Sequence, residues 1–411
     1  MKKFIFVIYL LLLTSVQSQN GKLSPKFYQD KREAFREKMP ENSVAVLFSA
    51  PIRNRANDVD YVFHQDPDFF YLSGWHQPHS VLMIYKNPQV DELGSFNEKI
   101  YIQERDRYKE LWNGKRYSID AVKKLGFERV TTRNHFIDDI SNLQSYDKIL
   151  MFGFNNDIRD QEDDPFDLFD LKAAFRKAIN FPNSFDRELY TVYQHILEAD
   201  EDNIESMREE VKAHLQKDST LIEDEIIKQF LLYPNNDFYT EVKTKTAFAL
   251  RNFNFDLVTL PQIMKDMREI KSDEEIELIK KAVAISVIGQ KEVMKAMHKD
   301  MTEREIQGIH EFVYRKYGAA DEGYPSIVGA GDNSCVLHYI ENEKKEIDNQ
   351  LLLMDLGAEF YGYTADVTRT IPANGSYSQA QRELYEIVYE AQEKAIQAAQ
   401  VGISFDSLYK L

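Results

Sequence analysis

One stretch near the C-terminal end organises this chain: LLLMDLG at 351–357, then AEFYGY at 358–363, then TADVTRT at 364–370. An apolar run ends on Asp355, a turn rich in glycine and tyrosine follows, and a β-branched run carries Asp366. This pattern predicts a β-hairpin. The two aspartates lie eleven positions apart, so their midpoint falls between residues 360 and 361, inside the turn. We therefore expect their side chains to face each other across the hairpin.

Two facing aspartates need an explanation, because like charges directly opposite each other destabilise a strand pair unless a cation lies between them. Carboxylates on rigid strands are hard oxygen ligands, suited to Mn²⁺, Mg²⁺ or Zn²⁺. Asp355 and Asp366 are therefore candidate metal ligands that would form half of a metal site. The alternative interpretation is an exposed hairpin with two solvated acids.

The composition is that of an ordinary globular protein. The chain has 411 residues, 43% hydrophobic and 29% charged, which is long enough for two or three domains. Its net charge of −17 argues against nucleic acid or an anionic membrane as a partner. A single cysteine, Cys335, excludes an intrachain disulfide, and we expect it to be a small buried hydrophobe.

The N-terminus has the residue pattern of an export signal. Lys2 and Lys3 precede an unbroken apolar run at 4–13, and small or permissive residues follow up to Ser18. This arrangement predicts a secretory signal peptide over residues 1–18 and a periplasmic or secreted protein. The run is too short for a stable membrane span, which needs about 20 apolar residues. An uncleaved anchor is the alternative.

The mature chain divides into three predicted parts. A helix at 25–38 with strands at 43–49, 80–85 and 99–102 indicates an α/β domain over residues 19–180. We interpret the histidines of this part as structural; they include His64, His76 and His79. Residues 181–270 form a charged, mainly helical join, and residues 271–411 form the last domain.

Three capping boxes mark helix starts in the last domain, because each pairs a hydroxyl residue with Glu or Gln three positions later. They are Ser272 with Glu275, Thr302 with Glu305, and Ser378 with Gln381. The apolar residues of the first helix are expected to share one face: Ile276, Ile279, Val283 and Val287.

The segment before the hairpin contains a third candidate site residue. Gly329 and Gly331 suggest a dinucleotide loop, but the third glycine is missing and a strand, not a helix, is expected next. His338 ends the apolar run at 335–337. It is either a satisfied core histidine or, beside a metal-binding hairpin, a donor to a developing oxyanion or a proton shuttle.

These residues together resemble a known family. The hairpin at 354–370 is similar to the metal hairpin of the pita-bread metallopeptidases, and within that group the chain resembles aminopeptidase P (Xaa-Pro aminopeptidase). Further separated blocks support the resemblance: Asn57–Gly74, Arg105–Gly114, Arg268–Ile276 and Tyr324–Tyr339. Only the helical join lacks such a block.

The resemblance implies a fold and an activity. The fold would be an RNase-H-like α/β domain of the creatinase N-terminal type, followed by an α+β pita-bread domain. The enzyme would bind two divalent metal ions, usually manganese, and release the N-terminal residue from peptides with proline in second position. Asp355 and Asp366 match metal ligands, and His338 matches the histidine thought to stabilise the tetrahedral intermediate. The family often forms dimers or tetramers, so the resemblance also implies that this chain can form a homo-oligomer.

The sequence departs from the family pattern after the hairpin. The family's remaining ligands, one histidine and two glutamates, follow the second aspartate, and no matching block occurs in 367–411. We therefore expect a catalytic domain truncated at its C-terminal end, and a 411-residue chain that is inactive by itself. The alternatives are a prolidase-like dipeptidase, a metal-free creatinase-like hydrolase, or a non-catalytic pita-bread binding protein.

Overall fold

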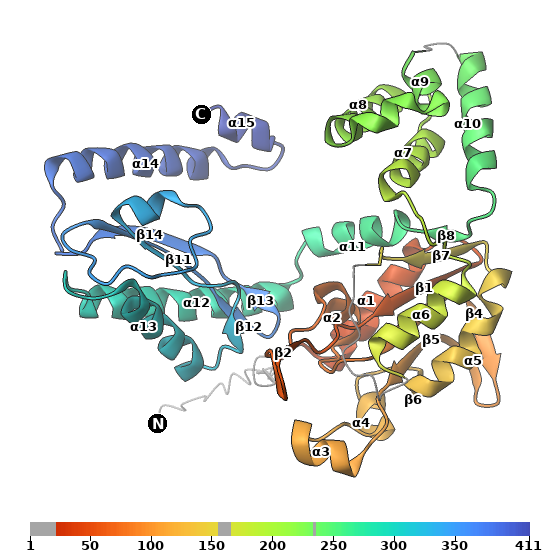
Figure 1. Ribbon diagram of the computed structural model, residues 1–411, viewed down its shortest axis with the longest axis horizontal. Helices are drawn as coiled ribbons and strands as arrows, with labels where there is room; N and C mark the ends of the chain where they lie inside the picture. The colour runs from red at the N-terminus through yellow and green to blue at the C-terminus, as the bar shows by residue number, and fades with distance from the viewer. Residues whose placement is uncertain (1–21, 155–165, 233–235) are drawn as a thin grey trace, which may run out of the picture. The chain divides into compact units, whose positions relative to one another are not determined.

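The computed structural model describes residues 22–154, 166–232 and 236–411 (Figure 1). The predicted signal peptide lies outside these residues. The chain contacts separate two compact units, Leu23–Ile270 and Lys271–Leu411. The predicted boundary at residue 180 stays a prediction. Within the described ranges, no helix combines the length and the apolar character needed to cross a membrane.

The first unit is built on a six-stranded mixed sheet with the order β6-β5-β4-β1-β7-β8. Strands β1, β4 and β5 pair antiparallel, whereas β6, β7 and β8 join parallel to their neighbours. The bounds are β1 Ser43–Phe48, β4 Val81–Asp91, β5 Gly94–Ile102, β6 Arg129–Thr132, β7 Lys148–Met151 and β8 Phe255–Asp256, with a separate β2–β3 hairpin at Asn54–Ala56 and Val59–Asp60. This confirms the predicted α/β class.

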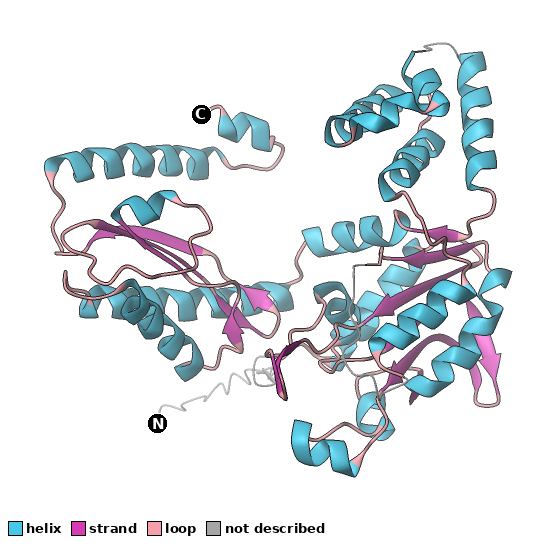
Figure 2. Ribbon diagram, in the orientation of Figure 1, coloured by secondary structure: helices cyan, strands magenta, loops and turns pink. Residues whose placement is uncertain are grey.

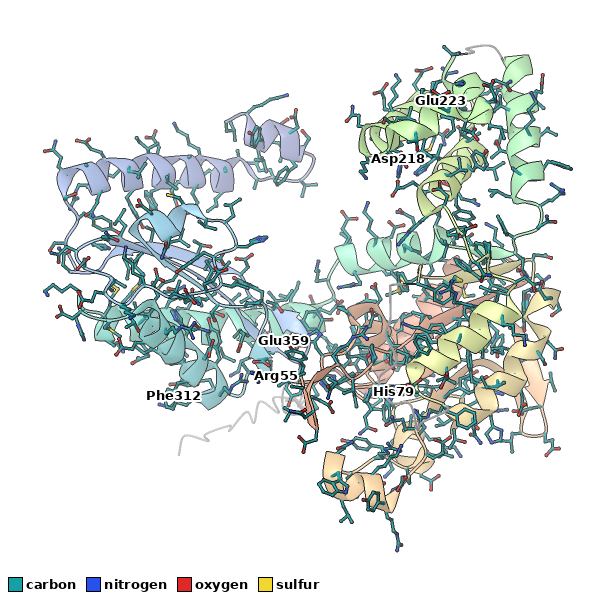
Figure 3. All side chains as sticks on the ribbon, viewed as in Figure 1. Arg55, His79, Asp218, Glu223, Phe312 and Glu359 are labelled. Carbon is teal, nitrogen blue, oxygen red and sulfur yellow. The ribbon has the colours of Figure 1, made fainter. Side chains whose placement is uncertain are left out.

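Helices cover both faces of this sheet (Figure 2). On one face, Val46 and Met83 join a core with Phe136 and Phe175 from two covering helices. The bounds are α1 Pro25–Lys38, α2 Pro67–Ser73, α3 Arg107–Asn113, α4 Ile119–Lys123, η1 Arg133–His135, α5 Phe136–Asp139, η2 Ile140–Ser145, α6 Leu168–Ala178 and α11 Thr259–Glu269. His79 is buried here and its Nδ1 accepts the Leu168 N–H at 3.0 Å, as a structural histidine should (Figure 3).

A group of helices with its own apolar core lies between α6 and β8 in the sequence. Val192, Ile196, Val211 and Ile227 are fully buried in this core. The bounds are α7 Arg187–Glu198, α8 Ile204–Lys217, η3 Ser219–Glu223, α9 Glu225–Leu232 and α10 Asn236–Leu250. This part is mainly helical, as the sequence predicts.

The second unit, all of whose residues are described, combines two small sheets with four α-helices. The sheet orders are β10-β11-β14 and β13-β12-β9. The bounds are α12 Asp273–Ala296, α13 Glu303–Lys316, β9 Asp321–Glu322, β10 Ile327–Ala330, η4 Gly331–Cys335, β11 Leu351–Leu356, β12 Ala358–Phe360, β13 Tyr363–Thr364, β14 Val367–Pro372, α14 Gln379–Ala398 and α15 Phe405–Tyr409.

Helices α12, α13 and α14 all begin at the predicted capping boxes, with both reciprocal hydrogen bonds present in each. The predicted apolar face of α12 is wrong, however, because Ile276 and Val283 are exposed. The buried face is rotated and includes Leu278, Ile285 and Gln290. The helix turns a partly polar face inward, and two side chains of this face bond to backbone groups of the strands, as described below.

Helices α12 and α13 pack closely around a buried histidine. His310 of α13 is fully buried, and its Nδ1 lies 3.1 Å from the Ile306 carbonyl. Its Nε2 has no hydrogen-bond partner among the described residues. Burial disfavours the charged imidazolium and lowers the pKa of His310 to about 4. His310 therefore stays neutral in the folded unit at neutral pH.

We predict that this histidine makes the second unit sensitive to acid. Between pH 6.5 and 4 the unfolded chain binds a proton that the folded chain does not, so stability falls as the pH falls. From pH 7 to 5 the loss from His310 is about 2 kcal/mol. Urea unfolding at both pH values should show a smaller loss for His310→Phe than for the parent. The exposed His298, changed to Gln, is the control and should keep the parental loss.

Candidate metal centre

The predicted hairpin is present, but its register differs from the prediction by one residue. Phe360 pairs with Tyr363, so the turn consists of Tyr361 and Gly362 alone. Both turn residues have positive φ, 49° and 82°, which is the signature of the tight type I′ turn. The midpoint consequently lies one residue later than the sequence midpoint of the two aspartates.

This register changes the partners of the aspartates. Asp355 lies in β11 opposite Thr368 of β14, not opposite Asp366. Leu356 pairs with Val367, which leaves Gly357 opposite Asp366. Because residues two apart on a strand share a face, Asp355 and Asp366 still project to the same side, as diagonal neighbours. The prediction that the two aspartates lie directly opposite each other, at equal distances from the turn, is wrong. The prediction that they project from the same face of the hairpin is correct.

The hairpin passes from one sheet to the other between its two aspartates. Strands β11 and β14 belong to one sheet, and β12 and β13 belong to the second. The crossing lies at Gly357 on one strand and at Ala365 and Asp366 on the other, which are outside regular strand structure. A Cβ at Gly357 would lie 1.5 Å from the Ala365 carbonyl oxygen, so only glycine permits this close approach.

Tyr324 brings the two carboxylates together. Its hydroxyl donates to Asp355 Oδ1 at 2.6 Å and lies 3.3 Å from Asp366 Oδ1. Burial, and then the hydrogen bond to Asp355, raises the pKa of this phenol well above its usual value, so it remains a donor. Asp355 is half-buried and Asp366 is exposed. In the sequence, the only signal for Tyr324 is its place at the head of the block at 324–339.

His338 lies in an exposed turn, not at the end of a strand. Residues Gly331–Cys335 form a 3₁₀ helix, and Cys335 is exposed, so the predicted strand and the predicted buried cysteine are both wrong. Local hydrogen bonding explains the difference, because Gly331 adopts a φ of +61° and its carbonyl accepts from the Ser334 hydroxyl at 2.5 Å. No hydrogen bond joins His338 to either aspartate among the described residues.

The loop that carries His338 is nevertheless held by a buried carboxylate. Glu303, at the start of α13, is fully buried. It accepts the N–H groups of Ala330 and Lys344 at 2.8 and 2.9 Å. It also accepts the Tyr339 hydroxyl at 2.8 Å, one residue after His338. Hydrogen bonds to Glu303 therefore hold the loop both before and after the exposed His338.

The chemistry of the described site fits a hard divalent cation. Two carboxylates converge on one hydroxyl, and all three groups offer oxygen atoms. Within the described ranges, no group of three or more His, Cys, Asp or Glu side chains is placed to hold a metal ion. The geometry thus brings Asp355 and Asp366 together and leaves His338 apart.

Comparisons with known proteins match both units. Residues 28–150 match the aminopeptidase P N-terminal domain, and residues 277–411 match metallopeptidase family M24. The chain is 27% identical to the Xaa-Pro aminopeptidase of Escherichia coli, covering 93% of this chain and 70% of that protein. It is 29% identical to the Haemophilus influenzae Xaa-Pro aminopeptidase, covering 93% and 69%. Zinc-substituted E. coli aminopeptidase P with bound product has a similar structure, with a TM-score of 0.66, 25% identity, and coverage of 94% and 71%.

We predict that Gly357→Ala disrupts the hairpin crossing. The new Cβ meets the Ala365 carbonyl, and relieving that overlap requires backbone movement that costs about 3 kcal/mol. Thermal unfolding should show the loss. The control is Gly308→Ala in α13, where a Cβ meets nothing within 4 Å. Alanine should stabilise that helix by about 0.5–1 kcal/mol. Parental stability in the Gly357 variant would contradict the close approach.

Proposed function

This chain belongs to metallopeptidase family M24 and carries an aminopeptidase P N-terminal domain, and on that basis we propose how it acts. It is a hydrolase of the aminopeptidase class that depends on a metal and releases the N-terminal residue of peptides with proline in second position. The observation that carries the proposal is the convergence of Asp355 and Asp366 on the Tyr324 hydroxyl. Peptides are the expected partners, and a homo-oligomer stays a prediction.

The residues of the hairpin and of the segment before it have separate tasks in this proposal. Asp355 and Asp366 would hold the divalent ions, which when bound lower the pKa of a water enough to make it a nucleophile. Tyr324 keeps one carboxylate oxygen hydrogen-bonded and so restricts the orientation of Asp355. His338, exposed on its anchored loop, is proposed to donate a hydrogen bond to the oxyanion of the tetrahedral intermediate.

We further propose Mn²⁺ as the working metal. Support comes from the donor set, since carboxylate oxygens favour hard ions such as Mn²⁺ over metals that prefer thiolates. A zinc-substituted form of E. coli aminopeptidase P has been solved, so the relative also accepts zinc. The identity of the ion in this chain is to be decided by comparing activity and binding across metals.

The substrate class can be tested with a matched peptide pair. With saturating Mn²⁺, we expect release of the first residue from Gly-Pro-Ala and not from Gly-Ala-Ala. Release by the 411-residue chain should be barely above background, because two carboxylates hold hard ions only weakly. Asp355→Asn should abolish it, whereas Asp348→Asn, an exposed aspartate of the same unit, should not change it.

Two results would count against this account. Equal release from both peptides would contradict the requirement for proline in second position. Fast Mn²⁺-dependent release by the 411-residue chain would contradict the expectation that the ligands named here make an incomplete metal site.

We also propose that the protein is exported after removal of residues 1–18. The support is the sequence pattern alone: Lys2 and Lys3, then the apolar run at 4–13. Expression in a bacterial host should yield a mature chain that begins at Gln19, as read by N-terminal sequencing. Leu11→Arg, which interrupts the apolar run, should block processing. A mature protein that retains Met1 would overturn the proposal.

A further inference from the structure

Helix α12 directs two buried polar side chains toward the hairpin at 351–372 that carries Asp355 and Asp366. Ser286 and Gln290 are 0% and 3% exposed. They are four residues apart and therefore lie on the same face of the helix. Burying polar groups in this way is costly unless each finds a hydrogen-bond partner. The hydrogen-bond partners of these two side chains therefore show what the buried polar groups contribute to the fold.

Both side chains bond to backbone groups at the crossing of the hairpin. The Ser286 hydroxyl accepts the Ala358 N–H at 2.9 Å. The Gln290 amide nitrogen donates to the Val367 carbonyl at 3.0 Å and approaches the Met354 carbonyl at 3.5 Å. Ala358 directly follows the break at Gly357, and Val367 is the first residue of β14, whereas Met354 lies within the continuous pairing of β11. The helix therefore adds side-chain hydrogen-bond partners at the edge of the strand pairing.

The two backbone carbonyls that the Gln290 amide contacts belong to residues next to the two candidate metal ligands. Met354 immediately precedes Asp355, and Val367 immediately follows Asp366. One amide nitrogen thus spans the two strands next to both aspartates. Because Asp355 and Asp366 repel each other when ionised, a link across the strands opposes their separation. Tyr324 touches the carboxylates themselves, whereas Gln290 holds the backbone that carries them.

The position of Gln290 is itself fixed by close packing. A Cβ at the neighbouring Gly289 would lie 3.0 Å from Tyr314 and 3.3 Å from His310 on α13. The absence of a side chain at Gly289 lets the two helices approach and leaves α12 little room to shift. Gln290 therefore reaches the hairpin from a rigid support.

We propose that Gln290, assisted by Ser286, is a positioning residue that sets the separation of Asp355 and Asp366 for metal binding. This rests on the proposed function, since it assumes that the two aspartates bind metal. Partners outside the ligand shell commonly change metal affinity by about 10–100-fold. The amide link is expected to act in this range without touching metal or substrate.

The test replaces Gln290 with Met, which keeps the length of the side chain and removes the amide. The control is Ile306→Val, a fully buried position on α13 whose substitution costs about 0.5–1.5 kcal/mol without altering a hydrogen bond to the hairpin. Two readouts are made on the 411-residue chain. Hydrogen exchange by mass spectrometry reports the backbone at 354–367, and electron paramagnetic resonance of added Mn²⁺ reports the metal dissociation constant.

For Gln290→Met we expect exchange at 354–367 to accelerate at least about tenfold and the Mn²⁺ dissociation constant to rise about tenfold or more. The control should leave both unchanged. Unchanged exchange in Gln290→Met overturns the proposal, as does accelerated exchange with unchanged Mn²⁺ affinity. If the parent binds no Mn²⁺, the proposed function fails at its metal site and this inference, which presupposes that site, is overturned with it. Parental Mn²⁺ binding with unchanged exchange in Gln290→Met overturns this inference alone.

Discussion

The convergence of two carboxylates, those of Asp355 and Asp366, on the single Tyr324 hydroxyl is the interaction around which the metal site of the second unit is arranged. They lie on a hairpin that changes sheets between them, where regular strand structure is interrupted at Gly357 and at Ala365 and Asp366. Such a position is unfavourable for an ordinary hairpin, since it combines like charges with an interrupted ladder. The surrounding structure compensates from two sides, with a phenol at the carboxylates and a helix at the backbone.

This arrangement explains several features that are otherwise unrelated. Gly357 permits the strands to touch at the crossing, and Gly289 permits α12 and α13 to approach behind it. The inward face of α12 is partly polar, and its Ser286 and Gln290 side chains bond to backbone groups of the strands. Glu303 performs a similar task for the loop that carries His338, where one carboxylate accepts from several donors. Ser286, Gln290 and Glu303 are thus buried polar groups that bond to backbone atoms of strands and loops in this unit.

The first unit has a different character. Its sheet is apolar on both faces, and its strands were visible as apolar runs in the sequence. Its match to the aminopeptidase P N-terminal domain accords with the α/β class predicted from those runs. In the second unit, buried polar side chains bond to the backbone around the hairpin. The match of this unit to metallopeptidase family M24 accords with the metal chemistry predicted for the hairpin.

The sequence by itself determined what short-range physics controls. It determined the starts of three helices, because a capping box is complete within four residues. It also determined the hairpin and the shared face of the two aspartates, because strand alternation is local. The family resemblance, carried by several separated blocks, supplied the fold of both units and the chemistry of the hairpin.

Only the tertiary structure decided the remaining features. The register depends on a two-residue turn that needs positive φ at Tyr361, an unusual conformation for a tyrosine. The inward face of α12 and the role of Tyr324 depend on groups distant in sequence, which no local pattern contains. The 3₁₀ helix before His338 replaced the expected strand because side chains there bond to nearby backbone and to Glu303. Local patterns fix which residues can bind, whereas long-range hydrogen bonds fix where they point.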